Sequence, residues 1–210
     1  MMIERYYYIM FKIVRDYPES KLFTYAIDGI LTLAHKIEAK MLASIVEALQ
    51  DSQETMQEIM DDMAARESSK NKFFMNHPGF VALMKKRMAT VFSSIEISSK
   101  ASFLDEMEER VSLTCLYRLL QDIIKYKFSL NHFEPIRKVK FLTLLEKLFL
   151  AKKHLSADCL AAFVKLLADF AASNLVPDEP FRLAVMEFVY LAIHVNFNFT
   201  LEIPETQKYA

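Results

Sequence analysis

Glycine and proline are scarce in this chain, which has only two glycines and six prolines among its 210 residues. Tight β-hairpins depend on turns built from glycine, often as Asn-Gly or Asp-Gly pairs. The one pair of this kind, Asp28-Gly29, lies inside an apolar pattern with helical spacing, so it does not mark a hairpin turn. The shortage argues against a sheet protein and predicts an all-α chain.

Cysteine is also scarce, and no apolar run is long. Cys115 and Cys159 are far apart, and each lies in an apolar helical pattern. Two such residues form neither a disulfide framework nor a zinc site, which favours a reducing compartment. No apolar run reaches the roughly 18 residues that span a bilayer. Glu4 and Arg5 precede the first apolar stretch and no small-residue cleavage site follows it, so we expect no signal peptide.

Signatures of catalysis are missing as well. Gly29 and Gly79 stand alone, whereas a phosphate-binding loop needs several neighbouring glycines. No His-Glu-x-x-His motif and no cysteine pair at zinc spacing occurs. The adjacent carboxylates Asp61 and Asp62 lie on a polar helical face, where we expect both to be solvated. The sequence therefore predicts a non-enzymatic protein with no cofactor, no metal and no small-molecule substrate.

Apolar residues are abundant and recur at helical spacing. They make up 53% of the chain against 25% charged residues, a balance typical of a folded core rather than of disorder. Capping residues and prolines divide the pattern into eight helices. Ser20, Ser156 and Asp178 are the clearest start signals. The predicted helices span about residues 3–15, 21–35, 38–66, 78–95, 103–126, 135–151, 157–172 and 180–195.

Short links join most of these helices, which favours antiparallel hairpins stacked side by side. Several helices are apolar on more than one face, as in HEAT-like and armadillo-like repeats rather than in compact bundles. The sequence thus predicts an α-solenoid of about eight helices in a single domain, 1–195. We expect a loop or insertion at the polar stretch 67–77, and an extended tail over 196–210.

The net charge is only −1, but the charges are unevenly distributed. Residues 44–67 hold seven acidic side chains and one basic one, whereas residues 125–153 hold eight basic and two acidic ones. Two interpretations remain open: solvated helix faces, or a basic patch that contacts RNA or an acidic partner. The candidate contacts with RNA or a ribonucleoprotein particle are Arg137, Lys138, Lys140, Lys152 and Lys153.

Aromatic residues crowd the first two predicted helices. Tyr7, Phe11 and Val14 share one face by their spacing and are most simply core. Tyr6 and Tyr8 point elsewhere, and tyrosine suits an interface because it combines a large rigid contact with a polar tip. Core and interface both remain open for this group, and we take Tyr6 and Tyr8 as candidate interface residues.

The last predicted helix is nearly all apolar between residues 181 and 195. A terminal helix in a stack has a neighbour on one side only, so one apolar face would lie in water unless a protein partner covers it. We expect a protein partner to cover either this end or the aromatic N-terminal end, and on this helix the candidate contact is the first of two faces. The first face carries Phe181, Val185, Phe188 and Leu191, and the second carries Leu183, Met186, Val189, Tyr190 and Ile193.

Three blocks of the sequence form recognisable motifs. The first is AIDGILTLAHKI at 26–37, followed by LASIVEAL at 42–49; the second is LEKLFLAKKHLS at 145–156, followed by AAFVKLL at 161–167. Between them lies LNHFEPIR at 130–137. These blocks resemble the nucleolar complex-associated (NOC) family in the same order: an acidic-Gly-Leu stretch with Ala-His, a Leu-Asn-Ile-Asp-Pro-Leu-Arg segment, and a Leu-rich helix before a basic stretch, a serine cap and an Ala-Phe-Ile-Lys run.

The resemblance implies both a fold and a function. It implies a helical-repeat scaffold that pairs with nucleolar complex-associated protein 2 in the nucleolus and nucleoplasm. The pair would associate with precursors of the large (60S) ribosomal subunit, through ribosomal proteins and pre-rRNA. The chain would be a reduced form, because the family's basic extensions are absent and Leu166 stands where a basic residue is usual. The alternative is an unrelated helical-repeat adaptor in the cytoplasm.

Overall fold

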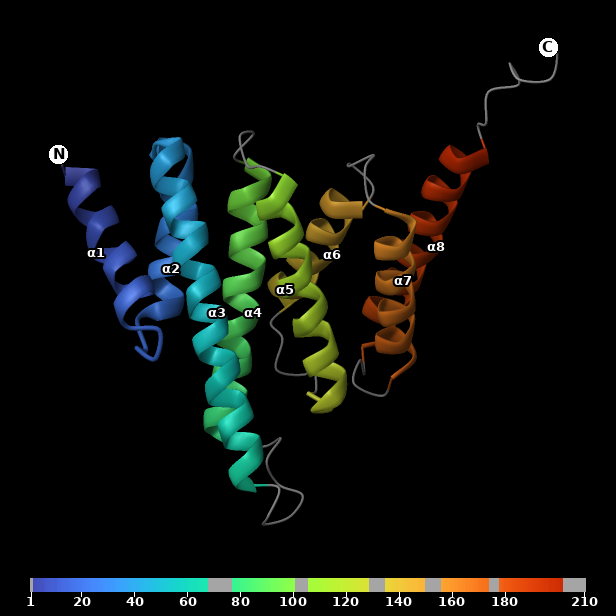
Figure 1. The fold of residues 1–210 in the computed structure, drawn as a ribbon, viewed down its shortest axis with the longest axis horizontal. Helices are drawn as coiled ribbons and strands as arrows, with labels where there is room; N and C mark the ends of the chain where they lie inside the picture. Colours follow the sequence, from blue (N-terminus) through green and yellow to red (C-terminus); the bar gives the residue numbers. More distant parts are fainter. Residues whose placement is uncertain are drawn as a thin grey trace. The chain divides into compact units, whose positions relative to one another are not determined.

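The computed structural model describes residues 2–67, 77–100, 106–128, 135–149, 156–173 and 178–201. Within these ranges the chain is helical with short links and no strand, which confirms the all-α fold class (Figure 1). No described helix is both long and apolar enough to cross a membrane. The helices in this part of the chain are α1 (Met2–Asp16), α2 (Phe23–Leu33), the short 3-10 helix η1 (Ala34–Lys36), α3 (Ala39–Glu67), α4 (Pro78–Lys100), α5 (Glu106–Lys125), α6 (Pro135–Phe149), α7 (Ala157–Ala172) and α8 (Glu179–Leu201).

Helix α7 begins and ends where the sequence predicts. The Ser156 hydroxyl accepts a hydrogen bond from the backbone N–H of Cys159 at 3.2 Å, which caps the first turn. Helix α4, by contrast, continues beyond its predicted end to Lys100. The serines near that end do not interrupt the helix, because Ile95 and Ile97 among them are buried and hold it against its neighbours.

Helix α8 also runs further than predicted, continuing past Val195 to Leu201. The expected extended tail, 196–210, is therefore helical in its first part, and the prediction was wrong there. The physical reason is that no glycine or proline occurs after Val195 until Pro204, so nothing stops the helix earlier. The rest of the tail, 202–210, lies outside the described residues.

Residue contacts divide the chain into two compact units, Met1–Leu119 and Leu120–Ala210, with α5 crossing the boundary. Each unit has its own packing and is described by itself. The prediction of a single domain over 1–195 concerns how the units are joined, and it stays a prediction. The predicted insertion 67–77 lies outside the described residues apart from its two end residues.

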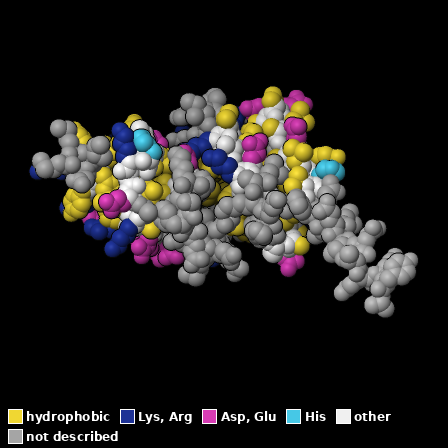
Figure 2. All heavy atoms as spheres, turned by 90° about the horizontal axis from the view of Figure 1, so that it is seen from above, with side chains coloured by type: hydrophobic (Ala, Val, Ile, Leu, Met, Phe, Trp, Pro, Cys, Tyr) yellow, Lys and Arg dark blue, Asp and Glu magenta, His cyan; other side chains and the backbone are white. Residues whose placement is uncertain are grey.

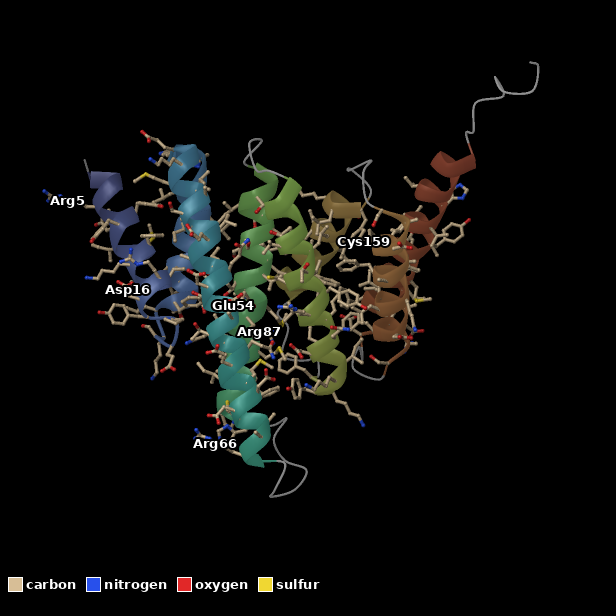
Figure 3. All side chains as sticks on the ribbon, in the orientation of Figure 1. Arg5, Asp16, Glu54, Arg66, Arg87 and Cys159 are labelled. Atoms are coloured by element: carbon tan, nitrogen blue, oxygen red, sulfur yellow. The ribbon has the colours of Figure 1, made fainter. Side chains whose placement is uncertain are left out.

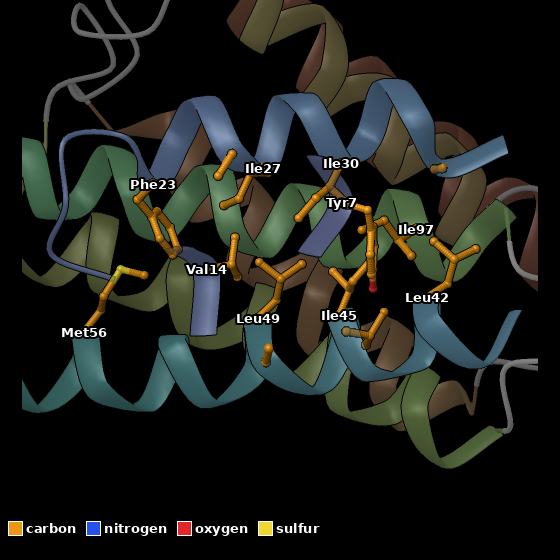
Figure 4. Packing of buried hydrophobic residues seen from close by; sticks show 14 residues of the cluster. Tyr7, Val14, Phe23, Ile27, Ile30, Leu42, Ile45, Leu49, Met56 and Ile97 are labelled. Carbon is orange, nitrogen blue, oxygen red and sulfur yellow. The ribbon is translucent and has the colours of Figure 1, made fainter. Parts of the chain in front are cut away.

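In the first unit, two helix hairpins pack on each other. Helix α1 pairs with α2 and α3 with α4, while α1 also packs on α3 and α2 on α4. Figure 4 shows that α1 and α2 run antiparallel, with Val14 beside Phe23 at one end and Tyr7 beside Ile30 at the other. The enclosed core draws on all four helices and includes Tyr7, Val14, Ile27, Ile30, Ile45, Leu49 and Ile97.

Gly29 lies in the middle of α2, where glycine is less favourable than alanine by about 1 kcal/mol. A Cβ atom at this position would overlap the sulfur of Met10 on α1. The glycine therefore lets α1 and α2 approach each other closely. Because the obstructing group is a flexible methionine side chain, a shift of Met10 can accommodate a small residue, whereas a large branched one would force the helices apart.

Lys86 of α4 ties the turn between α1 and α2 to the second hairpin. Its Nζ donates hydrogen bonds to the carbonyl oxygens of Pro18 at 3.1 Å and Glu19 at 2.7 Å. The same atom lies 5.9 Å from the centre of the Phe23 ring. Partial burial lowers the pKa of this amino group, and the Glu19 carboxylate acts in the opposite direction. The turn carbonyls thus receive a charged donor from a distant helix.

Helices α3 and α4 also share a buried polar contact at Arg87, which is labelled in Figure 3. Arg87 is only 3% exposed. The amide nitrogen of Gln53 donates a hydrogen bond to the Arg87 carbonyl oxygen at 2.8 Å, and Arg87 Nη1 lies 3.1 Å from the sulfur of Met60. Buried polar groups must be hydrogen-bonded to be tolerated, so this contact fixes how the two helices are aligned along their length.

Tyr7 gives the first unit a stability that depends on pH. Its hydroxyl donates a hydrogen bond to the Met41 carbonyl oxygen at 3.1 Å, and burial raises its pKa from 10.0 to about 12. The unfolded chain loses this proton near pH 10, whereas the folded chain keeps it up to about pH 12. The stabilisation is therefore complete below pH 10, and we expect up to about 3 kcal/mol of it to be lost as the pH rises toward 12.

Urea unfolding at pH ~8 and pH ~11.5 measures this loss, and Tyr7→Phe should shrink it because phenylalanine does not titrate. Tyr25→Phe is the matched control, since Tyr25 is 74% exposed, and it should behave like the unmodified chain. An equal alkaline loss in the Tyr7→Phe variant would show that other groups cause it.

In the second unit, α8 packs against α6 and α7. Aromatic rings form the centre of these contacts. The ring of Phe141 on α6 lies 6.1 Å from those of Phe170 on α7 and Phe181 on α8, measured between ring centres. The ring of Phe149 meets that of Phe188 on α8 edge to face at 5.9 Å. One face of α8 is therefore core.

Candidate protein-binding surface

The N-terminal hairpin separates its aromatic residues onto two sides. Tyr7 and Val14 are buried, and Tyr7 stacks on Phe11 with ring centres 6.1 Å apart. The prediction of core is confirmed for Tyr7 and Val14, with Phe11 partly buried at the edge of the core. Tyr6 and Tyr8 are both 62% exposed and lie at the surface.

A row of exposed apolar residues follows Tyr6 along α1. Ile9 and Tyr17 are both more than half exposed. Tyr6, Met10 and Tyr17 are four and then seven residues apart, so they share one side of the helix, with Ile9 beside them. Tyr8 lies on the other flank of α1, away from this row.

The matching side of α2 carries Leu22 and Tyr25, both exposed. Leu22, Tyr25 and Gly29 are three and then four residues apart, so they share one side of their helix. Because Gly29 faces Met10, these two sides meet along the seam of the hairpin. The resulting hairpin surface consists of Tyr6, Ile9, Tyr17, Leu22 and Tyr25.

Sequence reasoning missed four members of the hairpin surface as interface candidates: Ile9, Tyr17, Leu22 and Tyr25. One signal was available for Tyr25, which is two residues beyond Phe23 and so points away from the buried side of α2. Figure 2 shows hydrophobic side chains gathered at the surface over this N-terminal end of the first unit.

Two charged side chains at the end of α1, Arg15 and Asp16, pair with each other beside the hairpin surface. Arg15 Nε donates a hydrogen bond to Asp16 Oδ1 at 2.7 Å, and the Arg15 guanidinium lies 5.4 Å from the centre of the Phe11 ring. The hydrogen bond from Arg15 lowers the pKa of Asp16, which keeps this carboxylate ionised. The hairpin surface is therefore apolar with tyrosine hydroxyls at its tips, and it is suited to contact a protein rather than a phosphate backbone.

The face of α8 that was expected to bind a partner is buried instead. Phe181, Val185 and Phe188 are at most 5% exposed, because α6 and α7 cover them. Leu191 lies at the edge of this face and is 39% exposed. The prediction is therefore corrected: the first three are core of the second unit. The second face is uncovered except at Val189, which is buried; its exposed residues are Leu183, Met186, Tyr190 and Ile193.

Two of the five basic residues expected to contact RNA are described in full. Lys138 Nζ forms an ion pair with Asp178 Oδ2 at 2.5 Å and is mostly covered. The hydrogen bond from Lys138 lowers the pKa of Asp178, the residue that precedes α8. Lys140 is half-buried. Both of these lysines lie on α6. The other three lie outside the described residues: Lys152 and Lys153 entirely, and Arg137 by its side chain.

The remaining polar residues form no chemical centre in the part of the chain that the structure describes. No three His, Cys, Asp or Glu side chains lie there in a group that could hold a metal ion. Cys115 and Cys159 are free, and burial raises the pKa of both thiols, which keeps them protonated and weakly nucleophilic at neutral pH. The acidic side chains of α3 from Glu47 to Asp62 are exposed, and Asp62 pairs with Arg66 at 2.6 Å.

Comparison of the chain with protein-family models, curated proteins and solved structures finds no match. The resemblance to the NOC family therefore rests on the sequence motifs. In the structure, the motif at 26–37 covers most of α2 and all of η1, the motif at 42–49 lies on α3, and the motif at 161–167 lies on α7.

Proposed function

We propose that this chain is a non-enzymatic protein-binding scaffold, and that the hairpin surface is where its protein partner docks. The observation that carries this proposal is the exposure of three tyrosines and two aliphatic side chains on two touching helices. Contiguous exposed apolar areas on folded proteins mark interaction sites. Tyrosine is enriched among the few interface residues that supply most of the binding energy.

We further propose that the partner is nucleolar complex-associated protein 2, and that the pair acts in assembly of the 60S ribosomal subunit in the nucleolus and nucleoplasm. The support is the motif resemblance, in which nucleolar complex-associated protein 3 is the member that this chain resembles most. The motif at 26–37 adjoins the hairpin surface directly, because Tyr25 immediately precedes it on α2. A partner docked on the hairpin surface would therefore lie beside the segment that resembles the family.

Affinity purification of the full chain, followed by mass spectrometry and RNA sequencing, tests both levels of this proposal. The unmodified chain should recover nucleolar complex-associated protein 2 together with large-subunit precursors. Replacing Tyr6 and Tyr25 together by alanine should reduce partner recovery at least about tenfold, because hot-spot residues contribute about 2 kcal/mol or more each. Tyr8→Ala should have a smaller effect, since Tyr8 lies on the other flank of α1.

The matched control is Val139→Ala, which removes an equally exposed apolar side chain from α6. It should leave partner recovery unchanged, and all variants should unfold within about 0.5 kcal/mol of the unmodified chain. Recovery of cytoplasmic proteins without large-subunit precursors would support an unrelated helical-repeat adaptor instead. Undiminished recovery by the double tyrosine variant would contradict docking on the hairpin surface.

Contact with pre-rRNA is proposed for the basic segment 125–153. Replacing Lys140, Lys152 and Lys153 by glutamine should weaken association with the particle and make it less sensitive to salt, because each phosphate contact releases counterions. Binding of the protein partner should persist. Lys138 is left unchanged in this variant because its ion pair with Asp178 links α6 to the start of α8. Equal loss of particle and partner would point to a folding defect.

A further inference from the structure

The outer face of α8 carries four exposed apolar residues, Leu183, Met186, Tyr190 and Ile193. The intervals between them are three, four and three residues, which is the spacing of the contact positions in a two-stranded coiled coil. Tyr190 is held on this face by stacking on His194, with ring centres 6.0 Å apart. The opposite face of the same helix is already packed on α6 and α7, so this outer α8 face is a second, separate contact surface.

Two opposite charges flank the outer α8 face. In the coiled-coil pattern Leu183 occupies position a, which places Arg182 at position g before it and Glu187 at position e after it. A residue at g faces the e position five residues further along the neighbouring helix when two helices run parallel. Arg182 and Glu187 are separated by this interval. Within the described residues, neither side chain forms an ion pair with its own chain.

We propose that the outer α8 face docks on the same face of a second copy of this chain, with the two α8 helices parallel. Leu183, Met186, Tyr190 and Ile193 of both copies would form the apolar seam. Two-fold symmetry then sets Arg182 of each copy against Glu187 of the other, so the dimer would contain two equivalent ion pairs. An antiparallel arrangement would instead bring e positions together and, with Leu183 opposite Ile193, would set Glu187 of one copy against Glu187 of the other. The two charges therefore favour a second copy of this chain on the outer α8 face, and they favour a parallel orientation of its α8 helix.

The expected dimer is weak. The seam from Leu183 to Ile193 is about three helical turns long. Such a contact buries less than the ~1,200 Å² typical of stable interfaces, which places it among micromolar or weaker associations. The hairpin surface belongs to the first unit and the outer α8 face to the second, so partner binding and dimerisation are tested by separate variants.

Sedimentation velocity of the full chain over a wide concentration range measures the dimer, and charge reversal tests its geometry. Arg182→Glu and Glu187→Arg, each alone, should weaken the dimer about tenfold, because both symmetric pairs become repulsive. Mixing the two variants should restore association, since each copy then supplies the charge that the other needs. The double variant Arg182→Glu, Glu187→Arg should also dimerise like the unmodified chain.

Tyr190→Asp tests the apolar seam, and Val139→Asp is its control on a different exposed helix face of the same unit. The first should abolish dimerisation and the second should not, with unchanged helical circular dichroism in both. An unmodified chain that stays monomeric at every concentration overturns the proposal and leaves the outer α8 face to a different protein. Single charge reversals that have no effect, or a mixture that fails to associate, equally overturn it.

Discussion

Phe188→Asp is expected to unfold the second unit. It should not act by abolishing partner binding at the surface, because Phe188 is part of the core. Phe188 is 5% exposed, and its ring packs edge to face on Phe149 at 5.9 Å. The substitution removes a buried aromatic side chain and places a carboxylate where it would lie without water or a counterion. Loss of the ring alone costs about 3–5 kcal/mol, and the unpaired carboxylate adds to this cost. Few single domains retain a stable fold after such a change.

Urea unfolding followed by circular dichroism measures this effect, with Leu183→Asp as the matched control. Leu183 lies on the same helix but is 60% exposed. Its replacement should change the free energy of unfolding by no more than about 0.5 kcal/mol. Similar behaviour of the two variants would mean that α6 and α7 do not cover the face of α8 that carries Phe188.

Phe23→Ala is expected to destabilise the first unit by about 3–5 kcal/mol. Phe23 is fully buried at the start of α2, within the cluster that also contains Val14 and Met56. Its ring lies beneath the Lys86 amino group, which holds the adjoining turn. Removing the ring leaves a cavity at the point where the first hairpin meets α4, and surrounding side chains relax into such cavities only partly.

The comparison for this substitution is Tyr25→Ala, two residues along the same helix. Tyr25 is 74% exposed, so its removal should leave the unfolding free energy nearly unchanged. Guanidinium unfolding monitored by circular dichroism distinguishes the two variants by their transition midpoints. A small effect of Phe23→Ala would be inconsistent with the packing of α2 on α1 and α4.

Local signals predicted helix starts better than helix ends. Ser156 predicts the start of α7 correctly because its hydroxyl accepts a hydrogen bond from a first-turn backbone N–H. That N–H has no carbonyl partner within the helix. The ends of α4 and α8 were placed too early because serines and asparagines only weakly disfavour helix, whereas burial of Ile95 and Ile97 favours it. Only the positions of neighbouring helices decide where such a helix stops.

The same limit applied to the candidate site. Spacing identified two apolar faces on α8, but composition does not say which of them meets α6 and α7, since each face carries a large aromatic ring, Phe188 on one and Tyr190 on the other. That choice depends on Phe141 and Phe149, which lie far away in the sequence. On α1, by contrast, Tyr7 was correctly separated from Tyr6, because Tyr7 shares the helical spacing of Phe11 and Val14 and Tyr6 does not.

The hydrogen bonds from Lys86 have a consequence for the chain during translation. The donor to the Pro18 carbonyl oxygen lies 68 residues downstream of it. Because chains emerge N-terminus first, α1 and α2 leave the ribosome before this donor has been added. At that stage the inner side of the first hairpin lacks α3 and α4, while Tyr6 and Tyr25 already face solvent. A nascent chain of this length therefore exposes apolar residues on both sides of the hairpin. At this stage of synthesis the hairpin offers a chaperone its largest apolar binding surface.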